Sequence, residues 1–155
     1  MTDFEILIGK GLKKLSFGDR LDDIRIVLGE PDEIEENQYA DESLSKELRF
    51  NDLDILLTLS SEDDYRLTDI LIFNSKFHIN GQIRVGISKS LALDLATKFD
   101  FGDFVFEDLR SEENPTHELA MFDKVSLLLW FDNDLLSSIQ FGPLWIDDDT
   151  IKWPE

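Results

Sequence analysis

The chain has 155 residues, of which 34 are acidic and 15 are basic, so its formal net charge is −19 at pH 7. With 42% hydrophobic and 11% aromatic residues it is too apolar for an acidic disordered segment, and its length predicts one domain, residues 1–155. Nucleic acid and anionic membranes are poor partners for such a chain, because both are bound through basic surfaces.

The N-terminal residues 1–5 include neither the basic nor the apolar region of a secretory signal peptide. The apolar runs, such as 127–131, are far shorter than the roughly 20 residues that span a bilayer. We therefore expect a soluble cytoplasmic protein.

The first predicted helix follows the segment 15–18. Asp19 is a candidate N-cap, and Gly29 followed by Pro31 signals the end of the helix. Between them, four apolar residues recur at helical spacing: Leu21, Ile24, Val27 and Leu28.

An acidic, turn-rich connector is expected at residues 30–45, and alternating apolar runs follow it at 48–50, 53–59 and 67–73. The second of these runs places four apolar side chains on one face: Leu53, Ile55, Leu57 and Leu59. The short polar link at 60–66 predicts an antiparallel hairpin.

The same order of elements returns in the second half of the chain. After the segment 83–86, Ser88 can cap a helix whose apolar positions are Leu91, Leu95 and Phe99. An acidic connector at 107–118 then precedes three apolar runs: 119–121, 125–131 and 136–141. We expect an internal pseudo-repeat of approximately residues 9–80 and 81–146.

A helix followed by an antiparallel meander, given twice, predicts an α+β fold. In this fold two tandem helix-plus-meander repeats form one sheet, with the helices on one face. Strand alternation directs one set of apolar side chains toward those helices: Ile70, Ile72, Leu127, Leu129, Phe131, Ile139 and Phe141.

The segments Leu15–Gly18 and Leu28–Asp32 carry the pattern of an apolar-x-apolar-Gly start, a short helix and Leu-Gly-x-Pro-Asp. This pattern resembles the helix-plus-meander unit of the beta-lactamase-inhibitor-protein-like and outer-membrane-assembly-lipoprotein-like folds, and two tandem copies resemble the former. A small acidic protein so organised also looks like an immunity protein of bacterial polymorphic or contact-dependent toxin systems. That resemblance implies a non-enzymatic inhibitor.

No catalytic or metal-binding set is recognisable in the sequence. His117-Glu118 begins like the zinc-protease pattern HExxH, but Met121 stands where the second histidine is needed, and the chain has no cysteine. With 34 acids some carboxylates will lie close together by chance. We expect no enzyme activity, no cofactor and no metal.

The candidate partner-binding residues combine an acidic cluster with the sheet face that points away from the helices. Solubility alone would explain the acids, although −19 exceeds the net charge of about 2–8 that suffices for a small domain. Trp130 is the expected anchor, unless the C-terminal segment 145–153 or a second subunit covers it. The predicted set is Glu30, Asp32, Glu33, Glu35, Glu36, Asp54, Leu56, Asp69, Leu71, Leu128, Trp130 and Asp132.

These observations favour a monomeric or homodimeric immunity-type inhibitor that binds and neutralises a cognate basic toxin domain, with a nuclease as one candidate. Acids would speed the encounter with a cationic cleft, and apolar contacts would slow dissociation. Two alternatives stay open: an adaptor module that homodimerises through the exposed sheet face and, less favoured, a carboxylate-based enzyme.

Overall fold

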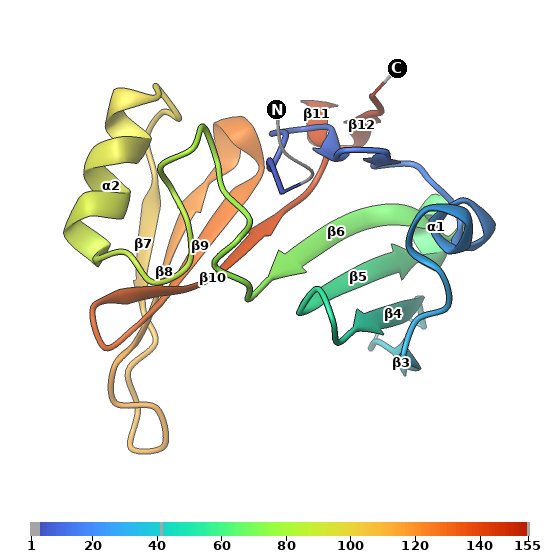
Figure 1. Cartoon of the computed structure of the whole chain (residues 1–155), viewed down its shortest axis with the longest axis horizontal. Helices are drawn as coiled ribbons and strands as arrows, with labels where there is room; N and C mark the ends of the chain where they lie inside the picture. Colours follow the sequence, from blue (N-terminus) through green and yellow to red (C-terminus); the bar gives the residue numbers. More distant parts are fainter. Residues whose placement is uncertain (1–3, 41, 155) are drawn as a thin grey trace.

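A computed structural model describes residues 4–40 and 42–154 and is dominated by one antiparallel sheet (Figure 1). Its eight strands are β3 (Glu33–Gln38), β4 (Leu44–Phe50), β5 (Ile55–Ser60), β6 (Arg66–Ile72), β7 (Val105–Asp108), β8 (His117–Phe122), β9 (Leu127–Asp132) and β10 (Leu135–Phe141). They lie in the order β3-β4-β5-β6-β10-β9-β8-β7. The middle of the sheet is therefore the β6–β10 pair, and β3 and β7 are its edges.

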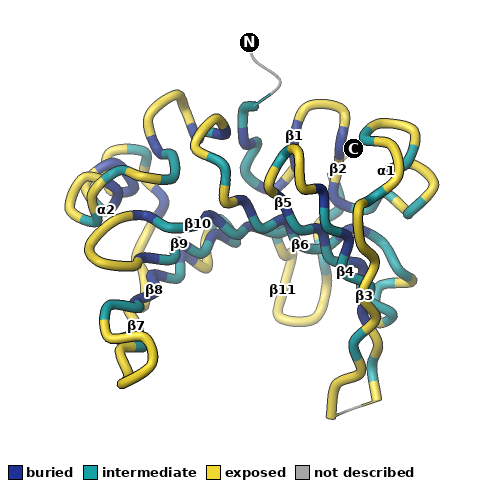
Figure 2. Tube along the Cα trace, turned by 60° about the horizontal axis from the view of Figure 1, so that its bottom comes forward, coloured by how far each residue is buried: buried dark blue, intermediate teal, exposed yellow. Residues whose placement is uncertain are grey.

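The remaining elements are short. They are the helices α1 (Leu21–Leu28) and α2 (Lys89–Lys98), the 3₁₀ turns η1 (Ser61–Asp63) and η2 (Asp123–Val125), and the two-stranded ribbons β1 (Gly11–Leu12) with β2 (Leu15–Ser16) and β11 (Leu144–Asp147) with β12 (Thr150–Lys152). Figure 2 shows both helices and the β1–β2 ribbon on one side of the sheet. The β7–β8 and β11–β12 hairpins and the described ends of β3 and β4 project on the other side.

Both helix ends follow from local chemistry. The Ser88 hydroxyl accepts a hydrogen bond from the Leu91 N–H (3.1 Å), which confirms the predicted N-cap of α2. Gly29 ends α1 at φ 82°, a left-handed conformation that favours glycine. The N-cap of α1 is Arg20 and not Asp19, whose carboxylate instead accepts from the Ser16 N–H (2.9 Å).

The core lies between the sheet and the helices. Seven side chains predicted to face the helices are each at most 1% exposed, which confirms that alternation: Ile70, Ile72, Leu127, Leu129, Phe131, Ile139 and Phe141. Ile24 and Leu95 bury the inner faces of α1 and α2 in the same cluster. Leu91, one of the three apolar positions that predicted α2, is 46% exposed.

The predicted hairpins are confirmed, with strands displaced by one or two residues. β9 and β10 are connected by the two-residue turn Asn133-Asp134. Both residues have positive φ (54° and 61°), which is the backbone conformation of the tight turns whose twist matches that of the paired strands. β5 begins at Ile55 and β9 at Leu127, because Leu53 lies in a turn and Val125 in η2.

The expected α+β fold of two tandem helix-plus-meander repeats is wrong. The structure is mostly β, with 45% of its residues in strands and 16% in helices. The helices have only 8 and 10 residues, and the eight strands form a single hydrogen-bonded sheet. The sheet therefore provides the framework, and each helix covers only part of it.

The two acidic connectors were also misassigned. Residues 30–45 contain β3 and the start of β4, and residues 107–118 contain the end of β7 and the start of β8. β3 and β7 are edge strands with almost no buried side chains, so they lack the apolar alternation by which a half-buried strand is recognised.

Candidate protein-binding face

The sheet surface opposite the helices, here called the open face, carries its side chains in rows set by strand register. One row crosses all eight strands: Glu33, Arg49, Leu56, Leu71, Gln140, Leu128, Met121 and Val105. On one side of this row lies a second, shorter row of Glu35, Glu47, Thr58 and Asp69 on β3 to β6. On its other side lies a third row of Ser138, Trp130, Leu119 and Glu107 on β10 to β7. Together they place apolar and aromatic groups mainly on the middle strands and carboxylates toward both edges.

A chain of hydrogen bonds crosses the middle of the open face. The indole Nε1–H of Trp130 donates to Oε1 of Gln140 (2.9 Å), and Nε2 of Gln140 donates to Oδ1 of Asp69 (3.0 Å). Because the indole can only donate, it orients the amide so that the NH₂ group faces Asp69. The His117 ring stacks on Trp130, with centroids 5.3 Å apart.

Asp69 is the carboxyl group most altered by its surroundings. Burial raises its pKa to about 7; the hydrogen bond from Gln140 opposes this rise, and the negative charge of Glu47 adds to it. The protonated form of Asp69 therefore persists to a much higher pH than that of an ordinary aspartate. Its position on β6, one of the two middle strands of the sheet, removes much of the water that would stabilise its charge.

A shallow cavity of about 230 Å³ lies beside Asp69, where β9 begins and β10 ends. Leu128, Gln140 and Trp145 are among its lining residues, and Trp145 is 51% exposed. Trp153, by contrast, lies against Gly18 and under Arg66, whose guanidinium is 5.3 Å from the Trp153 ring centroid. Trp145 of the C-terminal segment thus extends the open face, whereas Trp153 packs against Gly18 and Arg66 and does not cover Trp130.

The predicted acidic cluster is divided by the fold. Glu33 and Glu35 lie opposite Arg49 and Glu47 on the open face, whereas Glu36 alternates to the other face of β3. Glu30 pairs with Arg25 of α1, with Oε1 and Nε 2.9 Å apart. The Asp32 carboxylate accepts from the Asn51 N–H (2.7 Å) and so closes the turn after β4.

Asp54 and Asp132 lie at strand ends. Asp54 is exposed in the turn before β5, at φ 56°, and its N–H donates to the Asn51 carbonyl (3.2 Å). Asp132 ends β9, lies opposite His117 and accepts a hydrogen bond from the Thr116 hydroxyl. Leu56, Leu71, Leu128 and Trp130 are partly buried on the open face together with Asp69.

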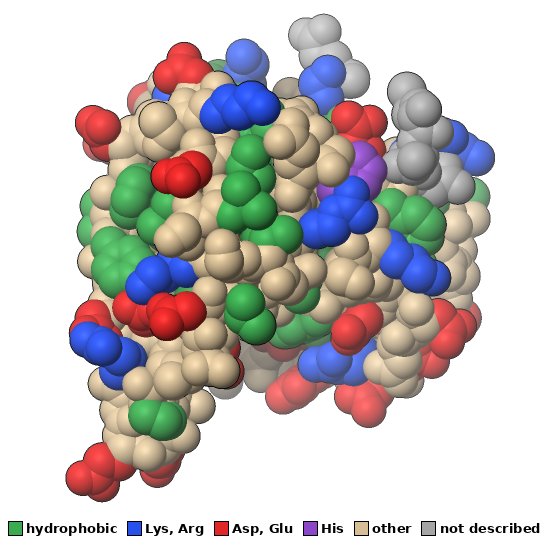
Figure 3. Space-filling model, turned by 60° about the vertical axis from the view of Figure 1, so that its left-hand side comes forward, with side chains coloured by type: hydrophobic (Ala, Val, Ile, Leu, Met, Phe, Trp, Pro, Cys, Tyr) green, Lys and Arg blue, Asp and Glu red, His purple; other side chains and the backbone are tan. Residues whose placement is uncertain are grey.

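Sequence reasoning missed the contributions of β4, β7 and β8 to the open face. Met121 and Leu119 extend its apolar part, while Glu47 and Glu107 extend its acidic part. The apolar run 119–121 predicts a strand, but only the pairing of Met121 with Leu128 shows that Leu119 and Met121 point to the open face. The β7 edge carries exposed Phe104, Val105 and Phe106. Figure 3 shows several groups of hydrophobic side chains on this side of the molecule, with acidic and basic side chains between and around them.

Within the part of the chain that the structure describes, no three His, Asp or Glu side chains are grouped so that they could hold a metal ion. None of the described helices has the length and apolarity needed to cross a membrane.

No protein-family model matches the chain, and no curated protein matches it in sequence. Among solved structures it is similar to YjgB, a DUF4309 family protein from Bacillus subtilis, at 12% identity and a TM-score of 0.51, over 87% of this chain and 88% of that one. It is also similar to the uncharacterized protein YfeY from Escherichia coli (14% identity, TM-score 0.49, 91% and 99% covered).

An extracellular SCP-domain protein from Bacillus anthracis gives 12% identity and a TM-score of 0.49 over 82% of this chain. This chain spans only 44% of that protein's length. At such identities the likeness to YjgB concerns the fold alone.

Proposed function

We propose that this chain is a non-catalytic inhibitor of the immunity type, which binds a basic toxin domain across the open face of its sheet. The observation that carries the proposal is the distribution of side chains on that face. Apolar groups around Trp130 occupy the middle strands, and carboxylates lie toward the edges, among them Glu35 and Glu107. Protein interfaces commonly combine an aromatic centre with a polar rim.

The physical roles of the two kinds of residue differ. Carboxylates at the edges attract a cationic partner and orient it before contact, so they act mainly on the association rate. Trp130 and its apolar neighbours lose water only in the bound complex, so they act mainly on the dissociation rate. The net charge of −19 also makes a basic partner the complementary one, and an immunity role would place the chain in the cytoplasm.

The direct test is binding of the purified chain to the toxin-like protein encoded beside its gene. We expect a 1:1 complex whose association rate falls steeply between low and physiological salt, and protection of cells that co-express both proteins. Absence of binding, or binding that salt does not weaken, would contradict the proposal.

One observation favours a second candidate, a carboxylate-based enzyme. Asp69, with a pKa raised to about 7, lines a cavity of about 230 Å³ and could serve as a general acid. An assay with chromogenic esters and glycosides decides between the two. Turnover that follows ionisation near pH 7 and disappears in Asp69→Asn would favour the enzyme over the inhibitor.

A further inference from the structure

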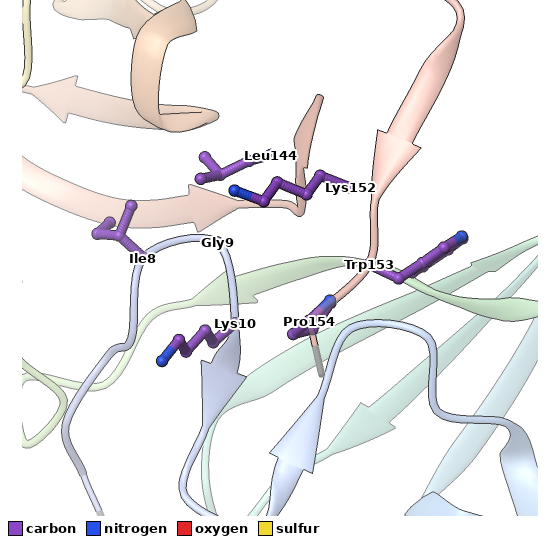
Figure 4. Close-up of a pocket in the computed structure, with 7 residues that line it drawn as sticks. All are labelled: Ile8, Gly9, Lys10, Leu144, Lys152, Trp153 and Pro154. Carbon is purple, nitrogen blue, oxygen red and sulfur yellow. The ribbon is translucent and has the colours of Figure 1, made fainter. Parts of the chain in front are cut away.

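We propose that the cavity between the N-terminal turn and the C-terminal ribbon binds a small anionic amphiphile, a monocarboxylate with a short apolar body (Figure 4). The cavity measures about 380 Å³, near the lower end for small-molecule sites. It lies outside the open face, and its lining residues are Ile8, Gly9, Lys10, Leu144, Lys152, Trp153 and Pro154.

Backbone pairing fixes the walls of the cavity. Gly9 forms a parallel bridge with Pro143, and Leu144 pairs with Lys152 across the β11–β12 ribbon. Gly9 has φ 74°, and a Cβ there would lie 2.7 Å from Cγ of Leu144, so only glycine allows the two segments to approach this closely. The turn that contains Gly9 and the β11–β12 ribbon are thus held close together on two sides of the cavity.

The interior of the cavity is mainly apolar and partly pre-formed. Ile8, Leu144, Trp153 and Pro154 are all partly buried. Trp153 is held from behind by its contacts with Gly18 and Arg66, so its ring does not depend on a ligand for its position. Such walls favour a hydrocarbon or aromatic body over a bare ion such as phosphate.

Two lysines supply the charge complementarity. Lys10 and Lys152 are exposed and come from opposite sides of the cavity, the first from the N-terminal turn and the second from β12 (Figure 4). Neither forms an ion pair with any described residue, whereas Lys89 and Lys124 both pair with acids. Among the described residues, no acidic side chain lines the cavity, although the chain has 34 acids. Ammonium groups at the border of apolar walls attract a carboxylate with an apolar tail.

The test uses octanoate below its micellar concentration, titrated into the full chain and followed by calorimetry. Octanol and octylammonium are the neutral and cationic probes of the same length. We expect one octanoate site, at least about tenfold weaker binding of octanol, and no binding of octylammonium, because a charge-assisted contact is worth roughly that factor. Equal binding of octanoate and octanol, or no octanoate binding, would overturn the proposal.

Variants then locate the site. Lys10→Met and Lys152→Met are each expected to weaken octanoate binding about tenfold, since each removes one charged contact. Lys98→Met, which makes the same charge change on α2, should leave the affinity unchanged. Ile8→Trp, which fills the cavity, should abolish binding while circular dichroism confirms the fold. An equal loss in Lys98→Met would show that net charge, and not this cavity, governs binding.

Discussion

At the residue scale, the hydrogen bonds that run from Trp130 through Gln140 to Asp69 connect β9, β10 and β6 on the open face. They satisfy the polar atoms of a partly buried amide, but they leave Asp69 in surroundings that favour its neutral form. The contribution of Asp69 to the free energy of unfolding therefore depends on pH, because burial destabilises the ionised form of its carboxyl group.

Asp69→Asn is expected to remove a pH-dependent loss of stability. The folded pKa of about 7 lies above the ordinary aspartate value of 3.8, so the contribution of Asp69 to stability is fully present below pH 3.8 and is lost as pH rises through 7. At pH 8 the variant should be more stable than the parent chain by at most about 4 kcal/mol, with little difference near pH 4. Urea unfolding at both pH values measures this.

Asp94→Asn is the matched control, because Asp94 is exposed on α2 and its substitution removes the same charge. A stabilisation at pH 8 as large as that of Asp69→Asn would assign the effect to net charge. Equal stability of Asp69→Asn and the parent chain at pH 8 would contradict the burial argument.

Trp130→Ala is expected to accelerate dissociation from the basic partner about thirtyfold, as loss of an aromatic anchor costs roughly 2 kcal/mol. Trp130→Phe, which keeps an aromatic ring but loses the bond to Gln140 and part of the apolar surface, should have a smaller effect. Surface plasmon resonance gives the rates, and near-ultraviolet circular dichroism checks packing. Ile26→Ala, an 84% exposed position on α1, should leave the dissociation rate unchanged.

At the element scale, the two edges of the sheet are protected differently. β3 carries Glu33, Glu35 and Glu36, and charges on an edge strand discourage pairing with another chain. β7 is only four residues long and exposes Val105 and Phe106. The acids of β3 therefore have a structural explanation besides partner binding, and kinetics can separate the two.

The double variant Glu33→Lys and Glu35→Lys is expected to slow association with the basic partner about tenfold at low salt, with little change in dissociation. Stopped-flow measurements over a range of salt concentrations test this. Asp22→Lys with Asp94→Lys makes the same charge change on the helices, away from the open face. An identical decrease in the association rate of both double variants would show that net charge, and not the position of the acids on β3, governs association.

The cap of α2 permits a simpler stability prediction. Ser88→Ala removes the hydroxyl that accepts the Leu91 N–H and should cost about 1 kcal/mol of unfolding free energy. Ser90→Ala, at an exposed position in the same helix, is the control. Urea unfolding gives both values, and an unchanged Ser88→Ala variant would show that the cap contributes nothing.

At the scale of the whole molecule, the proposed function needs the open face to be free before the partner arrives. We therefore expect light scattering at physiological salt to give a monomer of 17.9 kDa, since two chains of charge −19 repel each other. A tight dimer that dissociates on Trp130→Ala would instead favour the homodimeric adaptor.

The sequence alone determined the net charge, the alternation of β5, β6, β9 and β10, and the Ser88 and Gly29 helix signals. These features are local, because a strand with one buried face and one partly exposed face must alternate, and a helix end must satisfy nearby backbone groups.

Only the tertiary structure decided the edge strands, the rows of the open face and the state of Asp69. β3 and β7 bury almost nothing, so burial imposes no pattern on their sequences. Register joins residues as distant as Asp69 and Gln140, 71 positions apart, and no local pattern encodes that pairing. The raised pKa of Asp69 follows from the same cause, since the groups that exclude water from it come from strands far away in the chain.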